Sequence, residues 1–209
     1  MCGIAGTIGS FNNTCDQPGP LQEALRSMAH RGPDGYGQVA QSNWQLGVSR
    51  LAFKGSNPMP QPCTSSNGRW VVVLNGEIYD YEALGASLGM SKSELSSKGD
   101  VGVLAELLGR RGYKGLAEVE GHFVIAAIDR QEKLLLLARD AYGSKPLYWA
   151  HESGEIAFAS EVEALYHLVA LPLREESKSR IWLSICFISI QFQTKHHSRV
   201  FAWFHAVLV

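Results

Sequence analysis

The stretch 69–74, Arg-Trp-Val-Val-Val-Leu, constrains the fold of this chain more than any other. Its three consecutive valines are typical of a β-strand, because β-branched side chains pack well on a pleated surface. Side chains of a strand point alternately to its two faces, and here both faces are apolar. We therefore expect this strand to be buried on both sides, inside a layered structure.

Further strands and helices are predicted on both sides of this strand. The predicted strands are residues 3–10, 37–41, 44–50, 122–129, 133–139 and 155–160, and the predicted helices are 21–28, 80–88, 101–111, 114–119 and 161–168. Strands come first, helices follow, and strands return. This order favours an α+β architecture of two packed sheets with helices outside.

The composition is that of a soluble globular protein. With 209 residues, 45% of them apolar, the chain can bury a core of its own. A net charge of −1 argues against a nucleic-acid surface. Cys2, Cys15, Cys63 and Cys186 are scattered without a CxxC pair, which predicts neither a metal site nor a disulfide framework. Together with the lack of a signal-peptide pattern, this predicts a reducing, cytoplasmic location.

Cys2 is the first candidate for chemistry. Removal of Met1, which is expected before a small residue, would give Cys2 both a thiol and a free α-amine. A free thiol has a pKa of about 8.5 and needs help to ionise at pH 7, whereas an α-amine titrates near ~7.7–8.0 and can act as a base. One residue can then supply both the nucleophile and the general base. The alternative is a cysteine buried in an N-terminal strand.

Polar side chains stand at the predicted ends of several elements. Arg50 ends a strand and either grips a carboxylate with two parallel hydrogen bonds or remains solvated. Asn75 and Gly76 follow the buried strand and form either an oxyanion hole or an ordinary Asn-Gly turn. Asp100 is either a helix N-cap or an acceptor for a substrate ammonium. The turn at 32–35, Gly-Pro-Asp-Gly, is a surface turn or a loop that closes over a pocket.

Six motifs occur in the order of a known family. They are Cys-Gly-Ile-Ala-Gly at 2–6, His-Arg-Gly-Pro-Asp-Gly at 30–35, Ser-Arg-Leu at 49–51, Asn-Gly-Glu-Ile-Tyr at 75–79, Gly-Ser-Lys-Pro-Leu-Tyr at 143–148 and Phe-Ala-Ser-Glu at 158–161. Together they resemble the class II glutamine amidotransferase domain, in particular that of the glutamine-hydrolysing asparagine synthetases. The resemblance covers residues 2–171. It implies an N-terminal-nucleophile fold, a four-layer αββα sandwich of two antiparallel sheets.

The resemblance also implies roles for individual residues. Cys2 is the implied nucleophile, and Asn75 and Gly76 are the implied oxyanion hole. The residues implied to bind the two ends of glutamine are Arg50, with the backbone of Leu51, Ala52, Phe53 and Lys54, at its α-carboxylate, and Glu77 and Asp100 at its α-ammonium. The run Ala-Phe-Lys-Gly at 52–55 departs from the family's usual Ser-Ile-Val/Ile-Asp, so the backbone contacts there are less certain.

The synthetase half of that family has no counterpart in these residues. Its pyrophosphate loop, Ser-Gly-Gly-x-Asp-Ser, does not occur in the sequence. We therefore expect no cofactor in this chain, since ATP and Mg²⁺ would belong to a separate synthetase domain or polypeptide acting in trans. Glutamine is the expected substrate, and a homodimer is compatible with the sequence. The alternative function is a truncated, catalytically silent domain that binds an amino acid or a partner.

Residues 172–209 do not continue the resemblance. Two apolar stretches, 181–192 and 200–209, are too short for the roughly 20 residues of a membrane-spanning helix. An anchor at the membrane interface would show clearer amphipathicity. We therefore predict a non-family tail that is disordered or poorly packed.

Overall fold

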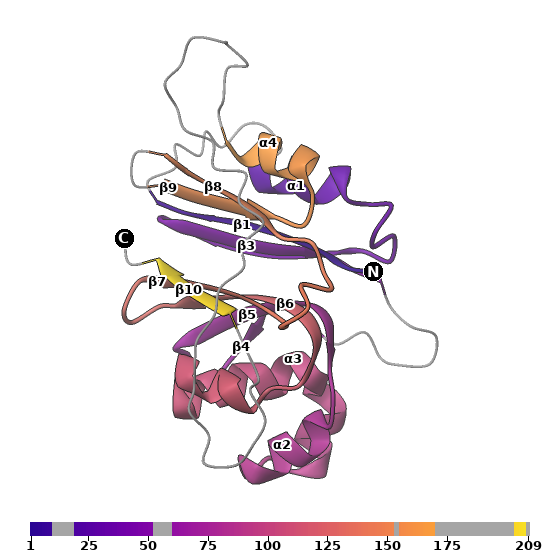
Figure 1. Cartoon of the computed structure of the whole chain (residues 1–209), viewed down its shortest axis with the longest axis vertical. Helices are drawn as coiled ribbons and strands as arrows, with labels where there is room; N and C mark the ends of the chain where they lie inside the picture. The colour runs from indigo at the N-terminus through magenta and orange to yellow at the C-terminus, as the bar shows by residue number, and fades with distance from the viewer. Residues whose placement is uncertain (10–18, 52–59, 153–154, 170–202, 208–209) are drawn as a thin grey trace. The chain divides into compact units, whose positions relative to one another are not determined.

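A computed structural model describes residues 1–9, 19–51, 60–152, 155–169 and 203–207 (Figure 1). The described residues form two compact units, and each unit contains one antiparallel sheet with helices. The first unit draws on Met1–Ala52 and Pro146–Cys186, and the second on Phe53–Lys145 and Phe187–Leu208. The predicted α+β class with two antiparallel sheets is confirmed.

The sheet of the first unit has the strand order β2-β3-β1-β9-β8. Its strands are β1 (Gly3–Ile8), β2 (Tyr36–Gln41), β3 (Trp44–Ser49), β8 (Tyr148–Glu152) and β9 (Glu155–Ala159). β1 is central: it pairs with β3 from Gly3↔Ser49 onward and with β9 from Ala5↔Ala159 onward. All six residues of β1 are buried. The segment that directly follows Cys2 is therefore a core strand.

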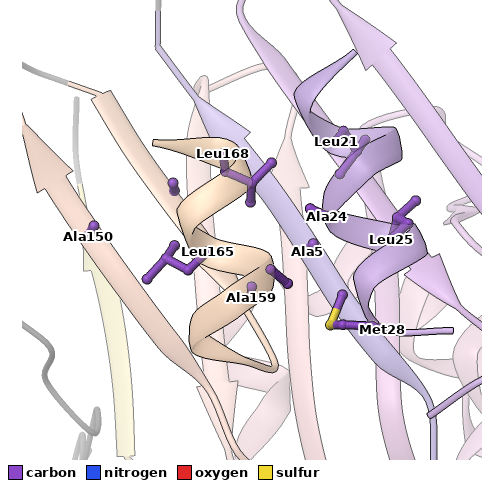
Figure 2. Packing of buried hydrophobic residues seen from close by; sticks show 11 residues of the cluster. Ala5, Leu21, Ala24, Leu25, Met28, Ala150, Ala159, Leu165 and Leu168 are labelled. Carbon is purple, nitrogen blue, oxygen red and sulfur yellow. The ribbon is translucent and has the colours of Figure 1, made fainter. Parts of the chain in front are cut away.

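Two helices, α1 (Pro20–Ser27) and α4 (Val162–Leu168), lie side by side on this sheet (Figure 2). Pro20 opens α1 at a position that needs no backbone N–H. The cluster between the helices and the sheet contains larger side chains from the helices and alanines from the strands: Leu21, Leu25, Met28, Leu165 and Leu168 with Ala5, Ala150 and Ala159. Small residues on the strands let the helices pack closely on the sheet.

The sheet of the second unit has the order β10-β7-β6-β5-β4. Its strands are β4 (Cys63–Thr64), β5 (Trp70–Ile78), β6 (Gly121–Asp129), β7 (Leu134–Arg139) and β10 (Trp203–Val207). β5 contains the valine run and is buried from Trp70 to Asn75. It pairs with β6 over nine residues, from Trp70↔Asp129 to Ile78↔Gly121. This long ladder fixes the register of β5 and therefore the positions of Asn75, Gly76 and Glu77.

The helices of this unit are α2 (Tyr81–Ser87), α3 (Lys92–Arg111) and the 3₁₀ helix η1 (Tyr113–Glu118), and α3 packs against β5. A capping box between Ser91 and Glu94 starts α3. The helix is kinked at Gly99, where φ is 57° and ψ is −160°. The predicted helix beginning at Asp100 is therefore only the part after the kink.

The structure excludes one alternative left open by the sequence, moves the start of one predicted helix and adds strands that were not predicted. Asn75 and Gly76 do not turn the chain, because pairing with β6 keeps β5 extended to Ile78. The helix predicted from residue 80 begins at Tyr81: Asp80 has a left-handed φ of 49° and makes no side-chain cap, whereas an N-cap residue is usually extended. The strands β4, β8 and β10 were not predicted, and they form as partners of β5, β9 and β7.

Most of the tail 172–209 lies outside the described residues. Its described part, β10, pairs antiparallel with β7 from Trp203↔Arg139 to Val207↔Leu135. The predicted domain boundary at 171 and the predicted disorder of the tail remain predictions. Among the described helices, none is long and apolar enough to cross a membrane.

Leu165 tests the packing of α4. It is 3% exposed, whereas the next residue, Tyr166, is 46% exposed. We expect Leu165→Ala to lower the free energy of unfolding by about 2–5 kcal/mol, because it removes buried methyl groups and leaves a cavity. Tyr166→Ala is the matched control in the same helix, with an expected loss within about 0.5 kcal/mol. Urea unfolding measures both, and equal losses would contradict the packing described.

Candidate active site

In the first unit, Cys2 lies directly before β1 and contacts the residue after Arg50. The Leu51 N–H donates to the Cys2 Sγ at 3.5 Å, and the Leu51 carbonyl oxygen is 4.0 Å from the same sulfur. Cys2 is half-buried. The structure therefore brings the predicted nucleophile to the chain segment predicted to bind the glutamine carboxylate. Ala52, Phe53 and Lys54, which were predicted to continue this segment, lie outside the described residues.

The loop 30–35 is fixed to the end of β3 beside Arg50. The Asp34 N–H donates to the Arg50 carbonyl at 3.0 Å, and the Arg50 N–H donates to the Gly35 carbonyl at 2.9 Å. Gly32 allows this close approach, since a Cβ there would lie 2.4 Å from the backbone of Ser49 and Arg50. The loop and Arg50 thus form one backbone-bonded unit. Closure of the loop over glutamine remains a prediction.

Arg31 is a residue of this site to which the sequence analysis gave no role. Its Nε donates to the Cys2 carbonyl at 3.1 Å, and its Nη1 donates to Glu161 at 2.9 Å. The terminal amine of Met1 donates to the Arg31 carbonyl at 3.1 Å. Both residues lie inside motifs that the sequence analysis singled out: Arg31 in His-Arg-Gly and Glu161 in Phe-Ala-Ser-Glu. Membership of these motifs was the sequence signal that could have indicated a role for them.

In the second unit, Asn75 and Gly76 occupy adjacent positions on β5. The Asn75 side chain is 1% exposed, and its buried Nδ2 finds no hydrogen-bond acceptor among the described residues. Gly76 has a φ of +145°, and a Cβ there would lie 2.1 Å from the His122 carbonyl oxygen. Glycine is therefore required by the neighbouring strand β6, a reason that the sequence did not reveal. Asn75 thus presents a buried donor beside an exposed glycine.

The two carboxylates predicted to bind the ammonium lie in the same unit. The Asp100 carboxylate follows the kink of α3 and accepts the Val101 N–H at 2.8 Å and the Ile78 N–H at 3.4 Å. Burial raises the pKa of Asp100; the two N–H groups oppose the rise in part, and the charge of Glu77 adds to it. The Asp100 carboxylate therefore accepts hydrogen bonds from the nearby backbone. These two bonds do not fully offset the cost of burying its negative charge.

The predicted site residues thus fall into two described groups. Cys2, Arg50 and Leu51 belong to the first unit, and Asn75, Gly76, Glu77 and Asp100 belong to the second. Within each group the members lie on one strand end or on segments hydrogen-bonded to it. The role of each residue remains a prediction.

Fold and sequence together define the class of protein. A model of the glutamine amidotransferase domain matches residues 1–202, and the chain belongs to this family. Two solved structures have a similar fold. One is the glutamine phosphoribosylpyrophosphate amidotransferase of B. subtilis with ADP and GMP, with a TM-score of 0.62 at 21% identity over 78% of this chain and 42% of that one. The other, described as the allosteric regulatory enzyme of purine biosynthesis, has a TM-score of 0.63 at 21% identity, over 80% and 43%.

Curated relatives narrow the resemblance further. The chain is 33% identical over 167 residues to asparagine synthetase [glutamine-hydrolyzing] 3 of Arabidopsis thaliana, covering 79% of this chain and 28% of the relative. It is 32% identical over 166 residues to asparagine synthetase B [glutamine-hydrolyzing] of Escherichia coli, covering 79% and 30%. The chain therefore spans less than a third of the length of these relatives. It is a glutamine amidotransferase domain similar to part of the asparagine synthetases.

The raised pKa of Asp100 predicts a stability cost at neutral pH. Above the ordinary carboxyl pKa of about 3.9, the folded protein holds a proton at Asp100 that the unfolded chain has lost. Stability therefore falls as pH rises through this window, and the loss persists at pH 7. We expect Asp100→Asn to stabilise the fold at pH 7 relative to wild type, with the gain shrinking toward pH 4 in urea unfolding.

Asp140 is a control for this prediction, because its pKa is shifted in the opposite direction. Burial alone would raise the pKa of Asp140, but hydrogen bonds from Ser144 and from the N–H groups of Phe123 and Tyr142 hold it below its usual range. The ionised Asp140 therefore stabilises the fold fully above the ordinary carboxyl pKa, and this contribution is lost as pH falls through the lowered pKa of the folded state. Asp140→Asn should therefore cost about 1–3 kcal/mol at pH 7. A gain for Asp140→Asn, or a loss for Asp100→Asn, would contradict these assignments.

Proposed function

We propose that this domain hydrolyses glutamine to glutamate and ammonia, with Cys2 as the nucleophile after removal of Met1. The observation that supports the proposal is the position of Cys2, which is the second residue of the matched glutamine amidotransferase domain and accepts a hydrogen bond from the Leu51 N–H. Its sulfur is next to a chain segment that is bonded to the loop 30–35. A nucleophile held in this way loses little entropy when it attacks a bound amide.

The proposed reaction has two steps. The α-amine of Cys2 takes the proton of its thiol, and the thiolate attacks the carboxamide carbon of glutamine. The tetrahedral intermediate collapses to a thioester as the protonated amine delivers its proton to the departing ammonia. Water, deprotonated by the same amine, then cleaves the thioester and releases glutamate and the thiol.

Asn75 and Gly76 are proposed to stabilise the negative oxygen of both tetrahedral intermediates. A buried amide N–H without an acceptor costs about 1–3 kcal/mol, so such a group is expected where a ligand supplies the acceptor. The Nδ2 of Asn75 is such a group among the described residues. The exposed Gly76 offers a backbone N–H on the next residue. Two adjacent donors are the usual composition of an oxyanion hole.

The two ends of glutamine carry opposite charges and are proposed to bind different groups. Arg50, with the backbone of residues 51–54, would take the α-carboxylate, and Glu77 and Asp100 would take the α-ammonium. The pKa direction of Asp100 supports this role, because a bound ammonium would compensate a carboxylate that burial disfavours.

The ammonia is proposed to serve asparagine synthesis by a synthetase domain or by a separate polypeptide. The support is the similarity to relatives named glutamine-hydrolysing asparagine synthetases. ATP and Mg²⁺ would bind in that synthetase part, and no cofactor is proposed for the residues described here.

A covalent label tests the nucleophile. We expect the diazoketone analogue 6-diazo-5-oxo-L-norleucine to add one adduct to residue 2 of the Met1-processed chain, visible by intact mass and peptide mapping. Cys2→Ala should show neither adduct nor glutaminase activity. Cys63→Ala is the thiol control and should react like wild type, because burial raises the pKa of Cys63 and keeps it unreactive. No adduct on a chain with proven Met1 removal would favour a silent binding domain.

Truncation of Asn75 tests the oxyanion donor. Asn75→Ala should lower kcat by about 10²–10³-fold, the usual effect of losing one such donor. Thr7→Val is a matched control, because the Thr7 hydroxyl is also buried without a partner among the described residues. A steady-state ammonia assay compares the two. Equal activity in both variants would remove Asn75 from the mechanism.

A further inference from the structure

We propose that Glu161 is a positioning residue for the N-terminal nucleophile, acting through Arg31. The inference rests on the proposed glutaminase function and adds to it a role for the motif Phe-Ala-Ser-Glu at 158–161. Glu161 touches neither the sulfur of Cys2 nor the predicted substrate-binding residues in the contacts described. Its effect would be transmitted by one guanidinium group.

A nucleophile at the second position needs anchoring, because chain ends fray unless they are tied down. The ladder between β1 and β9 begins only at Ala5↔Ala159, and the ladder with β3 begins at Gly3↔Ser49. Cys2 therefore lies just outside both ladders. Its backbone must be held by contacts other than sheet pairing.

Ser160 extends the pairing toward Cys2. Its N–H donates to the Ile4 carbonyl at 2.8 Å, and its hydroxyl oxygen accepts the Ile4 N–H at 3.0 Å. Both residues are fully buried. The Ser160 hydroxyl thus takes the place of the backbone carbonyl that would accept the Ile4 N–H if β9 continued. The backbone after Ser160 can therefore leave the sheet and enter α4.

The next residue, Glu161, reaches Cys2 through Arg31. Its Oε1 accepts Arg31 Nη1 at 2.9 Å, and Arg31 Nε donates to the Cys2 carbonyl at 3.1 Å. The guanidinium is planar and its donors have fixed directions, so holding Nη1 also aims Nε. The Arg31 side chain is only 11% exposed, which limits its alternatives. Glu161 thereby sets the orientation of the first peptide group after the nucleophile.

Glu161 has no competing role in its own helix. It is the N-cap residue of α4, yet its side chain makes no capping hydrogen bond. Besides Arg31, its carboxylate meets His30 Nε2 at 3.0 Å, and that histidine side chain is 62% exposed. An exposed pair of this kind contributes little. Arg31, whose side chain is much less exposed than that of His30, is therefore the partner through which Glu161 acts.

Misplacement of a catalytic group by about 1 Å can cost about 10²-fold in rate. Loss of the Glu161 charge should therefore lower kcat, because Cys2 would sample other orientations. The KM for glutamine should change little, since the backbone bonds of Arg50 to Asp34 and Gly35 do not involve the side chain of Arg31 or Glu161. A purely structural role would instead lower the stability of the fold and leave the kcat of the folded fraction unchanged.

The test compares Glu161→Gln with Glu163→Gln. Both remove one carboxylate from the start of α4, but Glu163 is exposed and lies in the first turn. We expect kcat of Glu161→Gln to fall about 10–100-fold at nearly constant KM, and Glu163→Gln to match wild type. Hydrogen exchange in the N-terminal peptide, residues 2–8, should be faster only in Glu161→Gln. Equal kcat and equal exchange in the two variants would overturn the proposal.

A double-mutant cycle with Arg31→Gln tests the route. If Glu161 acts through Arg31, adding Glu161→Gln to Arg31→Gln should cause no further loss of kcat. Additive losses would overturn the proposed route. Should Glu161→Gln fold poorly by circular dichroism, Glu161→Asp keeps the charge and should retain more activity than Glu161→Ala. If wild type proves to have no glutaminase activity, the proposed function fails, and the exchange measurement still decides whether Glu161 orders the terminus.

Discussion

The pairing of β1 with two neighbours is the interaction on which the site of the first unit depends. β1 is central and buried, so the segment directly after Cys2 lies in the core of the sheet. A terminal residue is normally mobile, and here its position is set by the strand that follows it. Arg31, which is held by Glu161, then donates to the Cys2 carbonyl, and Ser160 bonds both backbone groups of Ile4. The proposed nucleophile, although it is near a chain end, is thus held by the same kinds of contact as a residue inside a sheet.

The second unit holds its polar groups at a cost in stability. The ladder between β5 and β6 brings Gly76 so close to the His122 carbonyl that no side chain fits. The same strand presents a buried amide without an acceptor among the described residues, near a carboxylate whose pKa is raised by burial. Such arrangements are expected where a ligand completes the hydrogen bonds and charges, and they illustrate the usual trade of stability for function.

Local patterns in the sequence were enough to predict the fold class and most elements. The valine run, the Pro at the start of α1 and the short motifs each act over a few residues, so they can be recognised without tertiary information. The link from Glu161 to Cys2 could not be predicted in this way, because it joins residues far apart in sequence. The same holds for β8 and for the requirement for glycine at 76, which arise from a neighbouring strand.

The contact between Met1 and Arg31 has a consequence for the proposed removal of Met1. Met1 is 58% exposed, so an aminopeptidase can reach it on the folded domain. Excision would remove the hydrogen bond from the Met1 amine to the Arg31 carbonyl. The pairing of β1 begins at Gly3, so the sheet needs no backbone bond from Met1, and the proposed precursor and mature domain can share this sheet while they differ in the group that Cys2 carries.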